Sequence, residues 1–348
     1  RVDFKVSDID IRIEGRAGRI TLSRPAALNA LTYDMALAIE VAIDDWRNAD
    51  VDLVVIDAVG DRAFCSGGDI ADMYRSGLDG DLEYGRRFWR DEYRLNAKLF
   101  EYPKPIVSFL QGFTMGGGVG VGCHASHRIV GESSQIAMPE CGIGLVPDVG
   151  GSLMLARCAG HLGEYLGLTG TRMNAADAIL AGFADGFIPQ AKWEQLKADL
   201  VSGNINAIKY ETAPVGSLPP ILGDIDRHFA GTTLVDIEQS LKSDPSEFAI
   251  STLKSLGRHA PLAMACSMQI IRRLTPEDSI RAALELEFRF TYRAVAQGDF
   301  IEGIRAAIID KDRRPTWVHP TIRDVSMNDV EKMLSPLGPD GLKWNEMK

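Results

Sequence analysis

Three successive glycines, Gly116 to Gly118, lie in the segment GFTMGGGVG (112–120), and two isolated acids follow them. Glycine has no Cβ, so a ligand atom can approach main-chain N–H groups that a side chain would shield. Glu140 and Asp148 lie in IAMPE and GLVPDVGG, where the neighbours are apolar, Gly or Pro and a carboxylate gains little solvation. Backbone donors followed by such acids predict an oxyanion hole and acyl chemistry.

A second glycine pair lies upstream in FCSGGDI (64–70), where Gly68 directly precedes Asp69 at the start of a predicted helix. Either glycine cluster alone is most simply a tight turn from strand to helix. Together, a donor near Gly68 and a donor near Gly117 can serve one carbonyl oxygen. The sequence contains no GxxxxGK, GxGxxG, GxSxG or HExxH, so nucleotide, serine-hydrolase and zinc-protease motifs are lacking.

Composition narrows the function classes further. Of the 348 residues, 45% are hydrophobic and 25% are charged, which is typical of a globular protein with one large or two small domains. A formal net charge of −10 argues against a nucleic-acid surface. No apolar run approaches the roughly 20 residues of a membrane span, so neither nucleic acid nor membrane is an expected partner.

Cysteine usage indicates a reducing compartment. The five cysteines are odd in number and form no CxxC pair, so neither a disulfide framework nor a zinc knuckle is predicted. Cys123, His124 and His127 are the nearest approach to a metal cluster, and packing is the better interpretation; we expect no metal. The expected location is the cytoplasm if the source is bacterial. For a eukaryotic source with a removed targeting segment, it is the mitochondrial matrix.

Apolar periodicity predicts a repeated unit of two strands and a helix. Segments 9–15 and 18–25 alternate as strands do, and Thr32 can cap a helix that follows. Its apolar face would carry Met35, Ile39, Ala42, Ile43 and Trp46. The unit recurs in the strand-like segments 52–60, 62–68, 105–112, 128–132 and 135–140, with helical stretches at 70–100 and 151–181. This pattern predicts a ββα spiral in an α/β core rather than a doubly wound dinucleotide fold.

Composition changes at 213–223, where Pro and Gly break the periodicity. We therefore predict a core over 1–205, a linker over 206–235 and a helical region over 236–348. Thr275, Pro276 and Asp278 resemble a helix start, and the stripe that follows comprises Ile280, Leu284, Phe288, Thr291 and Val295. Segment 298–317 should continue as helix until Pro315. These apolar helices are a candidate surface for a homo-oligomer.

The motifs together resemble the enoyl-CoA hydratase (crotonase) superfamily. FCSGGDI and GFTMGGGVG are similar to the two halves of its oxyanion hole, SRPAALNAL (23–31) to its acyl-CoA pocket entry, and MPECGIGLVPDVGG (138–151) to its acid-bearing segment. The resemblance implies a crotonase-type spiral with a C-terminal helical region that completes an acyl-CoA site. It also implies an acyl-CoA substrate as partner and no cofactor, because the CoA belongs to the substrate.

Within that superfamily the chain resembles the 3-hydroxyisobutyryl-CoA hydrolases, from about residue 9 to about residue 320. The similar segments are FWRDEYRLN (88–96), GFTMGGGVG, MPE, PDVGG and GIRAAIIDKDRRPTW (303–317). This resemblance implies hydrolysis of a short branched 3-hydroxyacyl-CoA thioester, 3-hydroxyisobutyryl-CoA foremost, in valine catabolism.

The same resemblance assigns the site. It implies that the N–H groups of Gly68 and Gly117 hold the thioester oxygen, that Glu140 is the principal catalytic carboxylate and that Asp148 is its acidic partner. Glu92 matches a substrate-site acid, although Asp91 stands where many relatives have Glu. The other expected substrate contacts are Leu28, Asn29, Ala30, Ser66, Asp69 and Gly116. Lys311 and Arg313 are the expected partners of the CoA phosphates.

Two alternatives remain at the level of sequence. A hydratase of this superfamily carries its first glutamate two residues after the third glycine, and here that residue is Gly120. A hydratase or isomerase would therefore use Glu140 without it; a non-catalytic acyl-CoA-binding protein is the second alternative. Glu140 can attack the carbonyl to give a mixed anhydride or act as general base on water. Asp148 can bind the substrate hydroxyl, orient Glu140 or cap a turn.

Overall fold

A computed structural model describes residues 7–346 of the chain. Its contacts divide the chain into two units that alternate along the sequence. Unit 1 comprises the segment up to Asp69, Asp91–Ala137 and Arg172–Ser217; unit 2 comprises Ile70–Arg90, Met138–Thr171 and the chain from Leu218 onward. The linear boundaries expected near residues 205 and 235 remain a prediction.

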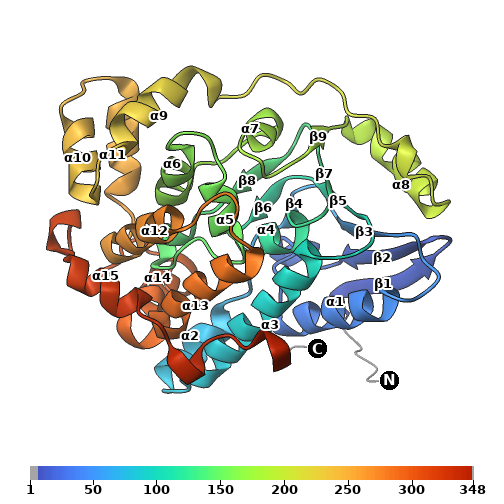
Figure 1. Ribbon diagram of the computed structural model, residues 1–348, viewed down its shortest axis with the longest axis horizontal. Coiled ribbons are helices and arrows are strands. Elements are labelled where there is room, and N and C mark those ends of the chain that lie inside the picture. The colour runs from blue at the N-terminus through green and yellow to red at the C-terminus, as the bar shows by residue number, and fades with distance from the viewer. Residues whose placement is uncertain (1–6, 347–348) are drawn as a thin grey trace. The chain divides into compact units, whose positions relative to one another are not determined.

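Both sheets belong to unit 1. Its strands are β1 (Ile9–Glu14), β2 (Ala17–Leu22), β3 (Leu53–Ala58), β4 (Ala63–Cys65), β5 (Ile106–Leu110), β6 (Phe113–Met115), β7 (His127–Val130), β8 (Gln135–Ala137) and β9 (Gly186–Phe187). The larger sheet has the order β1-β2-β3-β5-β7-β9 and the smaller sheet the order β4-β6-β8. Only the β1–β2 pair is antiparallel among these described strands (Figure 1).

From β3 to β8, each successive pair of strands contributes one strand to each of the two sheets. In each of the pairs β3–β4, β5–β6 and β7–β8, the first strand joins the larger sheet and the second joins the smaller one. The registers Val107↔His127 and Phe113↔Gln135 show parallel neighbours in both sheets. A helix follows each pair, α2 after β4, α4 after β6 and α5 after β8. The predicted α/β spiral of ββα units is therefore confirmed.

Helices of unit 1 pack on both of its sheets. They are α1 (Tyr33–Trp46), α4 (Gly117–Gly122), α7 (Ala175–Leu180), α8 (Trp193–Val201) and the second half of α3 (Leu82–Phe100). Helix α4 packs against β4, β5 and β6, and α1, α7 and α8 pack against the larger sheet. Thr32 caps α1 as predicted, since its side chain accepts from the N–H of Met35 at 3.1 Å. Trp193 and Leu196 of α8 pack with Val55 and Phe109 of the sheet in one apolar cluster.

A buried ion pair joins two strands of unit 1 to α8. Arg19 on β2 and Lys197 on α8 contact Asp57 of β3 at 2.9 and 3.0 Å, and Thr21 donates to the same carboxylate at 2.5 Å. Burial by itself raises the pKa of Asp57, but Lys197, Thr21 and Arg19 outweigh it and hold the pKa below its usual value. Asp57 is therefore a stabilising anion near neutral pH.

Unit 2 is helical. Besides the first half of α3, its helices are α2 (Ala71–Leu78), α5 (Gly151–Ala156), α6 (Leu162–Thr169), α9 (Leu222–Phe229), α10 (Leu234–Lys242), α11 (Glu247–Leu256), α12 (Pro261–Arg273), α13 (Ile280–Gln297), α14 (Phe300–Ile304) and α15 (Met327–Leu334). The predicted helical region 70–100 is two helices, because the chain turns at Gly80, whose φ of +82° is left-handed.

Two predicted helix limits in unit 2 were wrong. The start expected at Thr275 is a separate turn closed by Asp278, and α13 begins later, with Ser279 as its cap. The helix expected to reach Pro315 passes from α14 into a π-helical turn and ends at Ile309. Left-handed residues follow directly, and a right-handed helix cannot continue through them.

Candidate active site

Gly68 lies three residues after the end of β4, in an isolated parallel bridge to Leu31. The N–H of Leu31 donates to Gly67 O at 2.8 Å, and the N–H of Asp69 donates to Leu31 O at 2.7 Å. A parallel bridge of this kind uses the groups on either side of Gly68 and leaves the N–H of Gly68 itself outside the ladder. That N–H is therefore available to a ligand, as an oxyanion donor must be.

Gly117 is the first residue of α4, so its N–H has no acceptor within the helix. A Cβ built on Gly117 would lie 3.0 Å from Gly68 N and 3.2 Å from Glu92 Oε1. Gly116 before it has φ +52° and ψ −117°, a conformation open to glycine. The structure thus brings together the two predicted donor residues and Glu92, and their role in binding oxygen remains a prediction.

Glu92 is an almost fully buried residue of α3, with 4% of its surface exposed. Its neighbour Asp91 accepts hydrogen bonds from the hydroxyl of Tyr33 and from Arg94, the latter at 2.9 Å. Successive helix residues face different sides, so these contacts engage Asp91 away from the position of Glu92. Asp91 therefore serves the scaffold, and Glu92 is the acid beside Gly68 and Gly117.

The loop 23–31 is held against the segment that carries Gly68. Asn29, which is 1% exposed, donates to Val59 O and Ala63 O, both at 2.9 Å, and accepts from Arg24 N. The N–H of Ser66 donates to Leu28 O at 3.0 Å. The side chain of Asn29 therefore fixes the loop, and its expected contact with substrate remains a prediction.

Asp69 and Ala30 anchor the same loop through Arg24. The guanidinium of Arg24 donates to Asp69 Oδ2 and to Ala30 O, both at 3.0 Å. All of the substrate contacts predicted for 28–30, 66, 69, 92 and 116 accordingly lie in unit 1, together with the two donor glycines.

The two predicted catalytic acids both lie in unit 2. Glu140 opens the 3-10 turn Glu140–Ile143 and is 5% exposed, and Asp148 is 4% exposed. Gly144, with φ +74°, ends the turn, and the N–H of Leu145 donates to Glu140 O at 3.0 Å. The backbone therefore fixes Glu140 in a site where a carboxylate has little water, which favours its use in chemistry.

Cys141 directly follows Glu140, so its thiol is the alternative to the Glu140 carboxylate as a nucleophile. Its thiol donates to Gly167 O at 3.4 Å and lies 3.2 Å from Ser267 Oγ. Burial raises the pKa of Cys141 to about 12, although the hydrogen bond with Ser267 opposes the change. A thiol with that pKa is not ionised at neutral pH, so the adjacent carboxylate is the better candidate.

Sequence reasoning missed Glu287 on α13, which is fully buried. The N–H of Gly150 donates to Glu287 Oε1 at 2.9 Å, and the hydroxyl of Ser152 donates to Glu287 Oε2. Burial first, and then the negative charge of Asp148, raise the pKa of Glu287 well above its usual value despite these donors. A signal was present in the sequence, since Glu287 follows Leu284 by three positions and directly precedes Phe288, two residues of the predicted apolar stripe that did not itself include Glu287.

Lys311 and Arg313 lie in the loop after the π-helical turn, and both are exposed with left-handed φ values of +57° and +55°. Nearby Arg305 is engaged by Glu302, Asp310 and Asp312 at 2.7 to 2.8 Å. Within the described part of the chain, no ion pair involves Lys311 or Arg313. Both cations are exposed in an uncommon backbone conformation, and their assignment to CoA phosphates remains a prediction.

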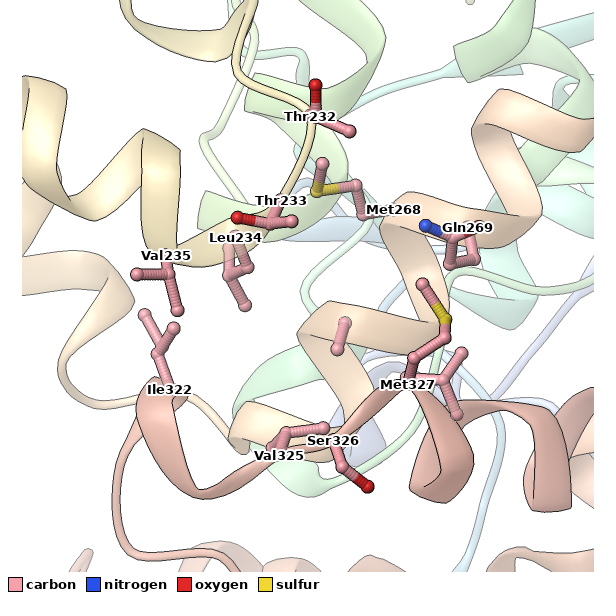
Figure 2. A pocket seen from close by; sticks show the side chains of 12 residues that line it. Thr232, Thr233, Leu234, Val235, Met268, Gln269, Ile322, Val325, Ser326 and Met327 are labelled. Atoms are coloured by element: carbon pink, nitrogen blue, oxygen red, sulfur yellow. The ribbon is translucent and has the colours of Figure 1, made fainter.

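A pocket of unit 2 lies elsewhere. It is lined by Thr232–Val235, Met268, Gln269 and residues between Ile322 and Val330, and has a volume of about 130 Å³ (Figure 2). The predicted site residues, all of them described, are not among its lining. In residues 7–346 no group of three His, Cys, Asp or Glu is placed to bind a metal. Nor does a helix of that range have the length and hydropathy of a membrane span.

Known proteins are similar to this chain over most of its length. The family described as enoyl-CoA hydratase/isomerase matches residues 17–334. The mitochondrial 3-hydroxyisobutyryl-CoA hydrolase of Danio rerio is 37% identical over 94% of this chain and 90% of its own. The human protein of that name is 33% identical, with coverages of 95% and 89%.

Two solved structures have nearly the same fold. One, named an enoyl-CoA hydratase from Rhodobacter sphaeroides 2.4.1, has a TM-score of 0.95 and 56% identity, and covers 97% of this chain and 100% of its own. The other, named a carnitinyl-CoA dehydratase from Mycobacterium thermoresistibile, has a TM-score of 0.93 and 35% identity, with coverages of 97% and 99%. The chain therefore belongs to the enoyl-CoA hydratase/isomerase family and, within it, to the group of the 3-hydroxyisobutyryl-CoA hydrolases.

Proposed function

We propose that this protein hydrolyses 3-hydroxyisobutyryl-CoA to 3-hydroxyisobutyrate and CoA, a step of valine catabolism. The observation that carries the proposal is the position of Gly117, where a side chain would meet the N–H of Gly68. Two backbone donors at one point are the arrangement that stabilises the oxyanion of an acyl-transfer intermediate. Acyl-CoA is the substrate, and no cofactor is needed because the CoA is part of it.

The donors act while the carbonyl oxygen gains negative charge. In the tetrahedral intermediate this oxygen accepts from Gly68 and Gly117, and each bond contributes about 3 kcal/mol. Along one route Glu140 attacks the carbonyl carbon and CoA leaves as thiolate; water then opens the mixed anhydride, which gives the acid product, restores the Glu140 carboxylate and supplies the proton that the thiolate takes up. Along the other, Glu140 takes a proton from a water that attacks the carbonyl carbon directly, the C–S bond breaks, and the departing CoA thiolate receives that proton. Both routes need the Glu140 carboxylate and the same two donors.

Asp148 supplies recognition of the substrate hydroxyl in this proposal. Asp148 is buried, and an acyl group without the hydroxyl forgoes the hydrogen bond to its carboxylate, which discriminates against deoxy substrates. Lys311 and Arg313 would hold CoA phosphates as exposed cations. The proposed location is the cytoplasm of a bacterium or the mitochondrial matrix of a eukaryote, the organelle named for the animal relatives.

A hydratase is the rival function, because a structurally similar protein carries that name. Gly120, where a hydratase has its first glutamate, is a buried residue of α4. The side-chain amide of Asn96, which is fully buried, donates to Gly120 O at 3.2 Å. The position thus serves packing and offers no carboxylate to bind or activate water. Hydrolysis is the better supported reaction for this chain.

The test measures free thiol from 3-hydroxyisobutyryl-CoA with and without a chelator, alongside hydration of crotonyl-CoA. We expect rapid CoA release that the chelator does not change, and slow or undetectable hydration. Efficient hydration of crotonyl-CoA without thiol release from the hydroxyacyl ester would overturn the proposal. Binding of acyl-CoA with neither reaction would favour the non-catalytic alternative.

A further inference from the structure

A turn with two left-handed residues follows Asp148. Val149 has φ +54° and Gly150 has φ +83°, and the N–H of Gly151 donates to Asp148 O at 2.7 Å. Left-handed backbone is unfavourable for a β-branched residue such as valine, so surrounding contacts must hold it in place. Asp148 is attached directly to this turn, and any change in the turn moves its carboxylate.

Glu287 supplies those contacts from α13. One carboxyl oxygen accepts from the N–H of Gly150 at 2.9 Å and the other accepts from the hydroxyl of Ser152. Gly150, Ser152 and Glu287 are all buried, so the loss of either hydrogen bond would leave a desolvated polar group without that bond, which is unfavourable. The carboxyl of Glu287 therefore links a long helix to both residues that flank the start of α5 at Gly151.

The charge state of Glu287 follows from its surroundings. Within residues 7–346 no Lys, Arg or His forms an ion pair with it, and Asp148 is a second acid nearby. Burial first, and then the nearby negative charge of Asp148, raise the pKa of Glu287 and so favour its protonated form. A neutral acid still accepts from Gly150 and shares a hydrogen bond with the hydroxyl of Ser152.

We propose that Glu287 is a positioning residue of the hydrolase reaction: it holds the Asp148–Ser152 turn and thereby fixes the carboxylate that recognises the substrate hydroxyl. This inference rests on the proposed function for the role of Asp148. It makes Glu287 act through Asp148, without contact to the substrate, and the loss on substitution must therefore depend on the hydroxyl of the substrate.

Three variants separate this role from packing. Glu287→Gln keeps an acceptor for Gly150 and an N–H for Ser152, Glu287→Leu removes both bonds, and Glu285→Gln is the matched control. Glu285 lies on the exposed side of the same helix, where it accepts from Trp344 at 2.6 Å, a bond that glutamine can keep. Each variant is assayed on 3-hydroxyisobutyryl-CoA and on isobutyryl-CoA, which lacks the hydroxyl.

We expect Glu287→Leu to lose about a hundredfold in kcat/KM on the hydroxylated substrate, as for a misplaced site group, and less than about tenfold on isobutyryl-CoA. Glu287→Gln should recover most of the activity that Glu287→Leu loses, since its amide oxygen accepts from Gly150 and its N–H donates to the hydroxyl of Ser152, although it does not accept from the N–H of Ser152. Combined with Asp148→Asn, Glu287→Leu should add little further loss, because both changes remove one function. Glu285→Gln should behave as wild type.

Equal losses on both substrates, or losses that add to Asp148→Asn, would show a general packing role and overturn the proposal. A Glu287→Gln variant as poor as Glu287→Leu would also overturn it. If Glu287→Leu does not fold, Ser152→Ala replaces it, with the same expected preference for loss on the hydroxylated substrate. The proposal then fails if that variant loses equally on both.

Hydrogen exchange separates this inference from the proposed function. The amide of Gly150 should exchange at least about tenfold faster in the folded Leu variant, and remain protected in the Gln variant. If wild type releases no CoA from either ester but this protection pattern holds, the proposed function fails and the anchoring of the turn stands. If wild type is active and the amide of Gly150 is unchanged in the Leu variant, the positioning role is wrong.

Discussion

A single methyl group on Gly117 tests whether the paired glycines form the oxyanion hole. In Gly117→Ala the new Cβ would lie 3.0 Å from Gly68 N and 3.2 Å from Glu92 Oε1. Gly117 begins α4 and is not among the glycines with positive φ, so alanine fits its backbone. The substitution therefore fills the space beside the Gly68 donor while leaving the helix intact.

The expected magnitudes differ for turnover and for stability. Loss of one oxyanion donor costs about 10²- to 10³-fold in kcat, or about 2.7 to 4 kcal/mol. The close contact with Gly68 requires a shift of a few tenths of an ångström, and such overpacking typically costs about 1 to 3 kcal/mol of stability. Activity should therefore fall much further than stability.

The assay is steady-state CoA release with thermal unfolding of the same samples. We expect kcat to fall at least about a hundredfold with little change in KM, because the lost bond forms mainly in the transition state. Gly223→Ala is the control, since its Cβ would meet no atom within 4 Å on α9. A folded Gly117→Ala enzyme with turnover within about threefold of wild type would refute the assignment of the hole.

Three further outcomes follow from the site and the scaffold. Glu140→Gln should nearly abolish CoA release, whereas Asp148→Asn should lose less, and less still on isobutyryl-CoA, because its bond is to the hydroxyl. Lys311→Gln with Arg313→Gln should raise KM about tenfold for the CoA ester and not for the pantetheine ester, which lacks the nucleotide phosphates. Asp57→Asn should lower the free energy of unfolding by about 3 to 5 kcal/mol at pH 7. That difference should shrink as pH falls from about 4 through the lowered pKa of Asp57.

A different outcome would contradict each of these three predictions. Asp148→Asn as inactive as Glu140→Gln on both esters would place Asp148 in the chemical step. Equal KM changes for CoA and pantetheine esters would remove Lys311 and Arg313 from phosphate binding. For Asp57, urea unfolding at pH 7 and pH 3 with the same deficit at both would show that the lost ion pair is not the cause.

The strands were predictable because their signals are local. Alternation in 9–15 and 18–25 corresponds to β1 and β2, and a capping threonine followed by apolar residues at helical spacing gave α1. The spiral also followed, since each pair of apolar runs precedes a helix. The pairing of β3 with β5, and of β4 with β6, comes from tertiary contacts that no local window contains.

The limits of helices in unit 2 depend on details that periodicity does not encode. Thr275 and Ser279 are both acceptable caps, and the sequence gives no reason to prefer the second; in the structure Asp278 engages the first. Helix α14 ends early although its sequence remains apolar through Ile309. The helix ends because Lys311 and Arg313 have a left-handed backbone conformation. Neither lysine nor arginine is typical of that conformation, so the sequence does not predict it.

The residues predicted to do chemistry were easier to find in the sequence than a residue that holds one of them in place. Glu140, Asp148 and the donor glycines stand out because their neighbours in sequence are unlike them. Glu287 is 139 positions from Asp148, and only the fold shows that its carboxyl reaches Gly150. The sequence showed only a glutamate between two residues of a predicted apolar helix face. A buried acid needs a hydrogen-bond partner, and the local sequence does not indicate which residue that partner is.

The names of similar proteins divide between hydratase and hydrolase, and the physical difference lies at few positions. Both reactions need two donors that polarise a thioester oxygen, so Gly68 and Gly117 fit either one. Hydration also needs a second acid to handle water at the double bond, and Gly120, bonded to Asn96 in a buried helix, provides none. Hydrolysis needs one carboxylate at the carbonyl carbon, and a second acid is free to select the acyl group. In this proposal, hydratases and hydrolases share one fold, and the Asp148–Ser152 turn that Glu287 holds positions Asp148 to select the hydroxylated acyl group.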